Sequence, residues 1–431
     1  MRVSRLLSLL LLVLPAMPGA AAATTLRVGP GSRYERPEAA LQEAKPGDTI
    51  LVAPRAGGAP YTKVALHVRQ PGIRIRSEGD ARIVFDGRGF DYSGRGAVPR
   101  AIVQFGPEAD GGLIEGFELR GAHNASHNGA GVRINQANNV VVRHCTIHRN
   151  DMGIMSNGNG RPGTATGQLI EGCLIHSNGD RTHPGYNHNL YLGGSEVTMR
   201  GCEVHSSLTG HNVKSRAHRN VIVACYIHDA ANRELDLVDG KGDTDRPGSD
   251  AVLFGNVIVK DPQCSGNRSV LHFGRDGGKG HDGTVWLVHN TIVTPFISPV
   301  VHLSTPQAKA VFVNNVVWDG GSGPRNQVLV QGGKAGAVSG THNWVASGFG
   351  AKVVGLQGLI TGARAEEPGF QDAGKRDFRL RKGALLVDRG TPLTAELLGG
   401  LRAGYEYRAP QGVVGRTWRG KPDLGAFEWD E

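Results

Sequence analysis

The chain has 431 residues, of which 64 are glycine, and its formal net charge is +9. A positive net charge suits an anionic partner. Aromatic residues make up only 6% of the chain, and no basic helix or base-stacking motif is visible, so we expect no nucleic-acid partner. The five cysteines are too few for a disulfide scaffold in a chain of this size.

Residues 1–23 have the pattern of a secretory signal peptide. Arg2 and Arg5 precede the apolar stretch from Leu6 to Leu14, and three alanines follow at 21–23. The apolar stretch is too short to span a bilayer, and no later segment is long and uncharged enough to do so. We therefore expect a secreted or periplasmic protein without membrane contact, with a mature chain that begins near Ala23 or Thr24.

The next predicted element is a short helix. Residues Pro37 to Ala44 (PEAALQEA) have an amphipathic pattern with proline in the first turn, and a turn at 45–48 and a strand from Thr49 to Val52 follow. A helix at this place can cover the open edge of the first coil of a repeat structure.

A local sequence frame then recurs at intervals of roughly 20 to 40 residues. It places a histidine three residues after each of Cys145, Cys173, Cys202 and Cys225, and it continues with asparagine in the cysteine position at Asn256, Asn290 and Asn315. The units contain short runs of period two and no helical periodicity. This pattern predicts an all-β fold, a right-handed parallel β-helix, in which these cysteines and asparagines stack inward as a ladder.

The repeat extends over most of the chain. We assign residues 24–365 to the β-helix and residues 366–431, where the repeat is lost, to a loop-rich C-terminal capping segment. We expect a monomer.

One strand of each coil carries an inward apolar pair, so the residue between the pair must point outward. These outward residues are Arg133, Met155, Tyr191, Lys214, Asp236, His272 and His302. On the same face we place Asn189, Asn212 and Glu234, each two residues before its outward residue, and Arg216, two residues after Lys214. Long polar segments at 157–167, 179–187 and 239–250 are expected to form the sides of a groove beside Lys214.

The chain resembles a known family at these residues. The repeats and the DLGAFE sequence at 423–428 look like the secreted parallel β-helix polysaccharide lyases, and the HNVKS sequence from His211 to Ser215, followed by NVI at 220–222, is similar to the catalytic-lysine strand of the alginate lyase and chondroitinase B family. The resemblance implies that Lys214 is the Brønsted base and that calcium neutralises the substrate carboxylate. The arginine of that family is not matched, because Asp236 stands at the position on the next coil.

We therefore predict a lyase that cleaves an acidic, uronate-containing polysaccharide by β-elimination. Lys214 is the expected base, Tyr191 or His272 donates a proton to the leaving oxygen, and Arg216 stabilises the developing charge. Glu234 and Asp236 are the expected calcium ligands. The residues expected to bind substrate are Arg133, Asn189, His211, Asn212, Arg275 and His302.

Other functions remain open at this point. A glycoside hydrolase needs two carboxylates, for which Asp236, Asp239 or Glu234 are available. An epimerase, or a non-catalytic protein that binds or assembles an exopolysaccharide, can use the same groove. Asp236 beside Lys214 favours a protonated lysine, as in a simple ion pair.

Overall fold

The computed structural model describes residues 22–79, 82–278, 280–321, 327–347, 349, 356–358, 360–362, 368–394 and 404–430. Nearly all of the predicted leader, and the predicted boundary at residue 365, lie outside these ranges. Within them, no helix has the length and apolar character that a membrane span requires.

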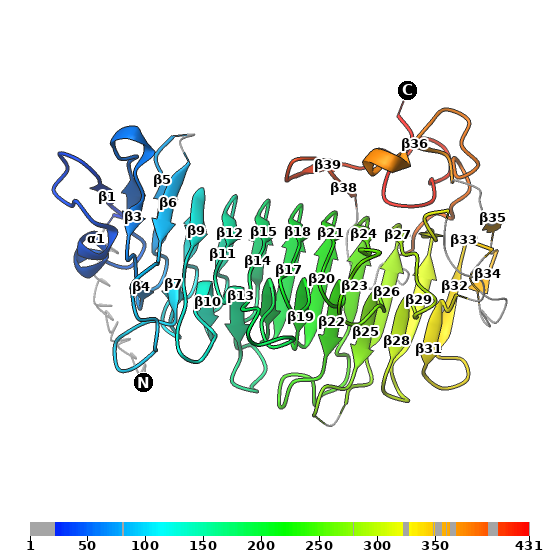
Figure 1. Cartoon of the computed structure of the whole chain (residues 1–431), viewed down its shortest axis with the longest axis horizontal. Helices are drawn as coiled ribbons and strands as arrows, with labels where there is room; N and C mark the ends of the chain where they lie inside the picture. Colours follow the sequence, from blue (N-terminus) through cyan, green and yellow to red (C-terminus); the bar gives the residue numbers. More distant parts are fainter. Residues whose placement is uncertain are drawn as a thin grey trace, which may run out of the picture.

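The chain folds as the predicted right-handed parallel β-helix, in which each coil from β2 (Thr49–Val52) to β31 (Val330–Gly332) contributes one strand to each of three parallel sheets, A, B and C (Figure 1). The described strands of sheet A are β1 (Thr25–Val28), β2 (Thr49–Val52), β5 (Arg74–Ser77), β8 (Leu113–Glu115), β11 (Val141–Arg143), β14 (Gln168–Glu171), β17 (Glu196–Arg200), β20 (Arg219–Val223), β23 (Ala251–Phe254), β26 (Thr284–Val288), β29 (Lys309–Val313), β32 (Val338–Thr341) and β34 (Leu356–Gln357).

The described strands of sheet B are β3 (Tyr61–Thr62), β6 (Ile83–Asp86), β9 (Phe117–Arg120), β12 (Thr146–His148), β15 (Leu174–His176), β18 (Glu203–His205), β21 (Tyr226–His228), β24 (Val257–Val259), β27 (Thr291–Val293), β30 (Val316–Trp318), β33 (Trp344–Ala346) and β35 (Ile360–Gly362). Those of sheet C are β4 (Leu66–Val68), β7 (Ala101–Phe105), β10 (Ala130–Asn135), β13 (Met152–Asn157), β16 (Leu190–Leu192), β19 (Val213–Ser215), β22 (Leu235–Val238), β25 (Leu271–Gly274), β28 (Val301–Leu303) and β31 (Val330–Gly332).

A short helix lies at the N-terminal end of the solenoid, as predicted (Figure 1). Helix α1 (Pro37–Glu43) has Pro37 in its first turn and buries the side chains of Pro37 and Ala40. A 3-10 turn, η1 (Ala56–Gly58), follows strand β2. The buried face of α1 covers apolar groups of the first coil that would otherwise meet water.

The inward ladder of the sequence frame is confirmed. The four cysteines of the frame are buried and free, and the asparagines continue the column. The side-chain amide of Asn256 donates to Oδ1 of Asn290 at 3.0 Å, and the amide of Asn290 donates to Oδ1 of Asn315 at 3.0 Å. Because these amides also donate to backbone carbonyls, the side-chain amides of the ladder are paired within the core.

The histidines of the frame form a stack of nearly parallel rings on sheet B, with successive centroids 5.0, 4.9 and 4.8 Å apart along His148, His176, His205 and His228. Stacked rungs repeat at about 4.8 Å in a parallel sheet, so the spacing follows from the coil itself. A straight row of this kind does not converge on a metal.

The described part of the C-terminal segment runs along the side of the solenoid (Figure 1). Strand β36 (Phe370–Asp372) pairs with β37 (Asp377–Leu380) around the 3-10 turn η2 (Ala373–Lys375), and β38 (Tyr405–Tyr407) pairs with β39 (Val413–Gly415). Residues from both hairpins bond to sheet B or its turns, as Arg376 does to Asp229 and Tyr407 to Glu203.

The C-terminal segment runs along the side of the solenoid because the outer side of sheet A carries an apolar stripe. The stripe and the tyrosine that covers it form one buried cluster of Val221, Val223, Ala224, Phe254, Val288, Val313 and Tyr407. An exposed stripe of this size is unfavourable in water, so the C-terminal segment removes it from solvent.

Candidate functional site

The outer face of sheet C carries the row of side chains that alternation predicts. The backbone register pairs Tyr191 with Lys214, Lys214 with Asp236, Asp236 with His272, and His272 with His302. The inward neighbours of these residues are buried. The row therefore presents one side chain per coil on neighbouring rungs, about 4.8 Å apart.

Asp236 is the centre of a dense hydrogen-bond network. Its Oδ2 lies 2.9 Å from Lys214 Nζ and 3.5 Å from His211 Nε2. Its Oδ1 lies 2.9 Å from His272 Nδ1 and accepts a bond from Arg233 at 3.2 Å. Burial alone would raise the pKa of Asp236, but the bond from His272 and the nearby positive charges hold that pKa well below its usual value. Asp236 is thus a permanent carboxylate that organises its neighbours.

Lys214 points outward and yet is only 8% exposed, because acidic side chains cover it. Its Nζ donates to Asp236 at 2.9 Å and to Asp276 at 2.6 Å. Burial would lower the pKa of Lys214, but the two carboxylates outweigh burial and raise the pKa above its ordinary value. The resting lysine is therefore a cation, which does not favour its predicted role as a base.

Asp276 bridges two cations of the site. Its Oδ2 accepts from Lys214 Nζ and from Arg216 Nη2, each at 2.6 Å. Its side chain is 37% exposed, so the bridge lies at the surface. One carboxylate oxygen between an ammonium and a guanidinium is the arrangement by which proteins recognise an anionic group.

The loop that carries Asp276 is held by Asp239. The carboxylate of Asp239 accepts from the backbone N–H groups of Asp276 at 2.6 Å, Gly278 at 3.3 Å and Gly280 at 2.5 Å. Asp239 is therefore an anchor of the loop after β25, and its oxygens are not free to act as a hydrolase carboxylate.

A second hydrogen-bond chain leaves Asp236 on the side of His272. His272 Nδ1 lies 2.9 Å from Asp236, and its Nε2 lies 2.7 Å from Ser304 Oγ. The backbone N–H of Arg275 donates to the same hydroxyl at 2.7 Å. With Nδ1–H donating to Asp236, Nε2 can accept the proton of Ser304, which is the geometry of an activated serine.

Tyr191 lies on the rung before Lys214 and contacts two groups of the site. The guanidinium carbon of Arg216 lies 5.7 Å from the centre of its ring. The ring of His188 meets it edge to face at 5.5 Å. His188 in turn stacks on His211 at 5.0 Å, so Tyr191 is supported by a small aromatic cluster.

The predicted positions of Asn189, Asn212 and Glu234 are wrong. All three are fully buried. The Asn189 amide donates to Asn212 at 2.8 Å, and the Asn212 amide donates to Glu234 at 2.6 Å. Each residue directly precedes its strand, in a turn where the alternation of strand side chains does not apply. They therefore form a polar ladder in the core and are not placed to bind substrate.

The predicted calcium site does not form from Glu234 and Asp236. Burial raises the pKa of Glu234 to about 7, and its oxygens accept from Asn212 and from the backbone of Ala230 and lie near Lys260 Nζ, at 3.6 Å. The oxygens of Asp236 are surrounded by donors. The two carboxylates lie on opposite sides of the sheet, and both already have hydrogen-bond partners. They therefore cannot coordinate one calcium ion together, which needs about six to eight oxygen ligands.

The other predicted substrate-binding residues are dispersed. Arg133 lies on the outer face of sheet C, three rungs before Lys214, and contacts Asn157. His302 stacks on His272 at 5.1 Å. Arg275 is exposed at the end of β25, whereas His211 is 6% exposed beneath the site. The roles of these residues stay predictions.

Four members of this site were not predicted from the sequence: His188, Arg233, Asp276 and Ser304. Arg233 bonds to Asp236 from the turn before β22, and Ser304 follows β28 directly. The RDGG sequence at 275–278 was a usable signal for Asp276, because a charged pair between glycines is typical of a functional loop.

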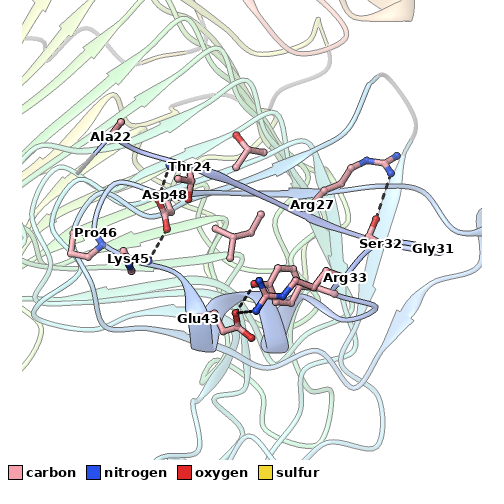
Figure 2. Close-up of a pocket in the computed structure, with 13 residues that line it drawn as sticks. Ala22, Thr24, Arg27, Gly31, Ser32, Arg33, Glu43, Lys45, Pro46 and Asp48 are labelled. Atoms are coloured by element: carbon pink, nitrogen blue, oxygen red, sulfur yellow. Dashed lines mark hydrogen bonds and ion pairs between the residues drawn. The ribbon is translucent and has the colours of Figure 1, made fainter. Parts of the chain in front are cut away.

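A pocket at the N-terminal end of the solenoid is a weaker candidate (Figure 2). Arg33 Nη2 lies 2.6 Å from Glu43 Oε2, and Asp48 accepts backbone bonds from Thr24 and Lys45, each at 2.8 Å. These polar groups bond to each other, so they fasten the ends of α1 and β1 and do not present reactive groups.

No protein-family model and no curated protein matches the chain. Among solved structures, the chain is similar to an alginate lyase from Paenibacillus sp. str. FPU-7, with a TM-score of 0.50, 17% identity and coverage of 73% of this chain and 99% of that one. It is also similar to pectate lyase Pel9A, with a TM-score of 0.52, 15% identity and coverage of 96% and 98%. At these identities the likeness establishes the fold that the chain shares with two polysaccharide lyases.

Proposed function

We propose that the face of sheet C around Lys214 binds an acidic, uronate-containing polysaccharide and cleaves it by β-elimination. The observation that carries this proposal is the bridge in which the Asp276 carboxylate lies between Lys214 and Arg216, at 2.6 Å from each. A uronate carboxylate offers the same oxygens and can take the place of Asp276. The two lyases that share the fold are named for alginate and pectate, both polymers of uronic acids.

β-Elimination requires the removal of the proton at C5 of the uronate, and the charge of the carboxylate opposes this step. Two cations bound to the carboxylate stabilise the enolate-like transition state more than the ground state. Lys214 and Arg216 supply these cations. We therefore assign Lys214 to charge neutralisation, because its raised pKa keeps it protonated.

The proton transfer is then assigned to Tyr191. It lies on the adjacent rung, beside Arg216, so its phenolate oxygen can take the C5 proton of a sugar whose carboxylate is bound at Lys214. The same tyrosine then gives that proton to the departing glycosidic oxygen. His272 is less suitable, because both its ring nitrogens already have partners in Asp236 and Ser304. If Lys214 is instead the base, the variant Lys214→Arg should behave differently.

A glycoside hydrolase is less well supported. Its general acid is a carboxyl group with a raised pKa. Salt bridges and hydrogen bonds lower the pKa of Asp236 and of Asp276, and Glu234, which has a raised pKa, is buried behind the sheet. An epimerase would remove the same C5 proton but leave the chain intact.

The deciding experiment is incubation of the mature protein with a panel of polymers, which includes alginate, polygalacturonate, glucuronan and chondroitin. Unsaturated products, seen by ultraviolet absorbance, together with new reducing ends support the lyase. Reducing ends alone indicate a hydrolase. Intact chains with changed uronate configuration indicate an epimerase, and binding without any product indicates a binding or assembly protein. The last three outcomes all exclude the proposal.

The chain from Ser304 through His272 to Asp236 favours a second candidate function, the hydrolysis of an acyl ester on the polysaccharide. Ser304 Oγ would attack the ester carbonyl, His272 would accept its proton and pass it to the departing sugar hydroxyl, and water would then release the carboxylic acid. Release of acetate from an O-acetylated uronate polymer, lost in Ser304→Ala, tests this candidate. Acetate release that is the same in Ser304→Ala would exclude it.

The positive leader and apolar stretch at 1–23 support export of the protein, which suits a polymer outside the cytoplasm. N-terminal sequencing of protein recovered from the periplasm or the medium tests this, with Ala23 or Thr24 as the expected first residue.

A further inference from the structure

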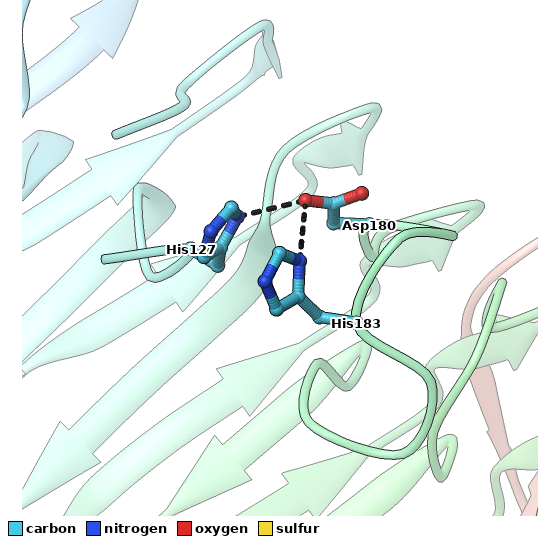
Figure 3. Close-up of side chains that lie close together, drawn as sticks. All are labelled: His127, Asp180 and His183. Atoms are coloured by element: carbon cyan, nitrogen blue, oxygen red, sulfur yellow. Dashed lines mark hydrogen bonds and ion pairs between the residues drawn. The ribbon is translucent and has the colours of Figure 1, made fainter. Parts of the chain in front are cut away.

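Two loops beside sheet C bring three metal-binding side chains together (Figure 3). His127 lies in the loop at 121–129, between β9 and β10. Asp180 and His183 lie in the loop at 177–189, between β15 and β16. Sequence distance hides this cluster, because a whole coil of the solenoid separates the two loops.

The three possible ligand atoms converge on one point. His127 Nδ1 lies 2.7 Å from Asp180 Oδ2, and His183 Nδ1 lies 3.2 Å from the same oxygen. One ligand atom from each residue can be chosen so that all three lie within 4.8 Å of one another. Ligand atoms around a tetrahedral zinc ion are about 3.3 Å apart, given bonds of about 2.0 Å. Small side-chain rotations are therefore enough to admit an ion.

The arrangement differs from an ordinary ion pair. One imidazole suffices to pair with one carboxylate, but here two imidazole rings stack at 3.5 Å between centroids and direct their Nδ1 atoms to one oxygen. The other oxygen of Asp180 is held in place by the backbone N–H of Thr182 at 2.9 Å and by its hydroxyl at 2.6 Å. Figure 3 shows both rings facing the carboxylate.

Buried contacts fix the backbones that carry the ligands. Asn187 is fully buried. Its side-chain amide donates to the carbonyl of His127 at 2.6 Å, and its Oδ1 accepts from the backbone N–H of Asp180 at 3.2 Å. One side chain thus clamps both loops, so the cluster is preorganised before any ion binds.

The donor set selects the class of metal. Two imidazole nitrogens and one carboxylate oxygen suit zinc and its neighbours among the transition metals, whereas calcium and magnesium prefer oxygen ligands alone. All three side chains are partly exposed, with side-chain exposures of 31% for His127, 23% for Asp180 and 43% for His183. An ion can therefore enter from solvent and keep water in the remaining position.

We propose that His127, Asp180 and His183 form a binding site for a divalent transition metal of the zinc class, which joins the loop at 121–129 to the loop at 177–189. The second loop includes His188, whose Nδ1 accepts from the backbone N–H of His211 and whose ring contacts Tyr191. The metal would thus stabilise the flank of the sheet C site. Metal binding itself does not depend on the proposed lyase activity.

The test is calorimetric titration of chelator-treated, untagged protein with ZnCl2, with CaCl2 and MgCl2 as parallel titrants. We expect one zinc ion per chain, a higher melting temperature with zinc, and much weaker binding of calcium and magnesium. Asp180→Asn and His183→Ala should each weaken zinc binding on the order of 100-fold, since even outer groups around a metal contribute 10- to 100-fold. His342→Ala, which removes a half-buried imidazole near the far end of the solenoid, should bind zinc like the wild type.

Circular dichroism of each variant without metal checks that it is folded, and Asp180→Asn keeps the shape of the side chain if His183→Ala does not fold. Zinc binding that is equal in the wild type and in the two cluster variants would overturn the proposal. So would an absence of zinc binding, or a preference for calcium.

Discussion

Asp276 follows Lys214 by 62 residues in the chain, yet its Oδ2 accepts a hydrogen bond from Lys214 Nζ at 2.6 Å. The same oxygen accepts from Arg216. The protein thus places one of its own carboxylates where two cations meet, and in the function proposed above the uronate carboxylate displaces it.

The first prediction concerns this displacement. Asp276→Asn removes the internal charge, so a uronate carboxylate should bind more tightly, and KM should fall by about fivefold, since a partly exposed ion pair is worth about 1 kcal/mol. Steady-state kinetics on the polymer that the panel identifies measures the change. An unchanged KM together with a large loss of kcat would instead make Asp276 part of the chemistry.

The second prediction separates the two roles of Lys214. Lys214→Ala should reduce kcat/KM on the order of 100- to 1,000-fold, as the loss of a transition-state charge contact does. If Lys214 neutralises charge, Lys214→Arg should recover roughly a tenth of the wild-type activity or more, because guanidinium stays charged. If Lys214 is the base, Lys214→Arg should be as inactive as Lys214→Ala. Single-turnover rates of both variants, measured relative to the wild type, exclude an effect on product release.

Much of this site could be predicted from the sequence, and the limits have physical causes. The row from Tyr191 to His302 follows from strict alternation within strands, and the structure confirms its register. The alternation of side chains ends where a strand ends. For this reason the prediction that Asn212 and Glu234 point outward from sheet C is wrong. The position of Asp276 depends on a loop fixed by Asp239, and no periodicity encodes such a loop.

The third prediction tests the asparagine ladder. Asn290→Ala removes the core acceptor of both the backbone N–H and the side-chain amide of Asn256. The free energy of unfolding should fall by about 1–3 kcal/mol, the usual cost of an unsatisfied buried group. Urea denaturation measures this change. Asn267→Ala, on an exposed loop, is the matched control and should change stability little; equal effects of the two substitutions would argue against the ladder.

The fourth prediction concerns acid stability. Burial and the neighbouring His205 lower the pKa of His176 to about 4 from an ordinary value of 6.5. The unfolded chain therefore binds a proton at this residue at a higher pH than the folded chain does. The free energy of unfolding should therefore keep its full value above pH 6.5. It should fall as the pH is lowered from 6.5 to about 4. Burial lowers the pKa of His211 to about 4 as well, so it adds to the same loss.

Urea denaturation at several pH values measures this loss. His176→Gln should give a shallower decline over this window than the wild type, and His342→Gln should not. A decline of equal steepness in His176→Gln would show that other groups govern the pH dependence.

We propose above that the cations on sheet C promote cleavage of a uronate polymer by elimination. The most direct measurement follows unsaturated products and reducing ends together in one reaction, for the wild type and for Arg216→Ala, across the polymer panel. We expect one acidic polymer to yield the two products in equal amounts with the wild type, and far more slowly with Arg216→Ala. Reducing ends without unsaturation, or no product from any uronate polymer, would contradict it.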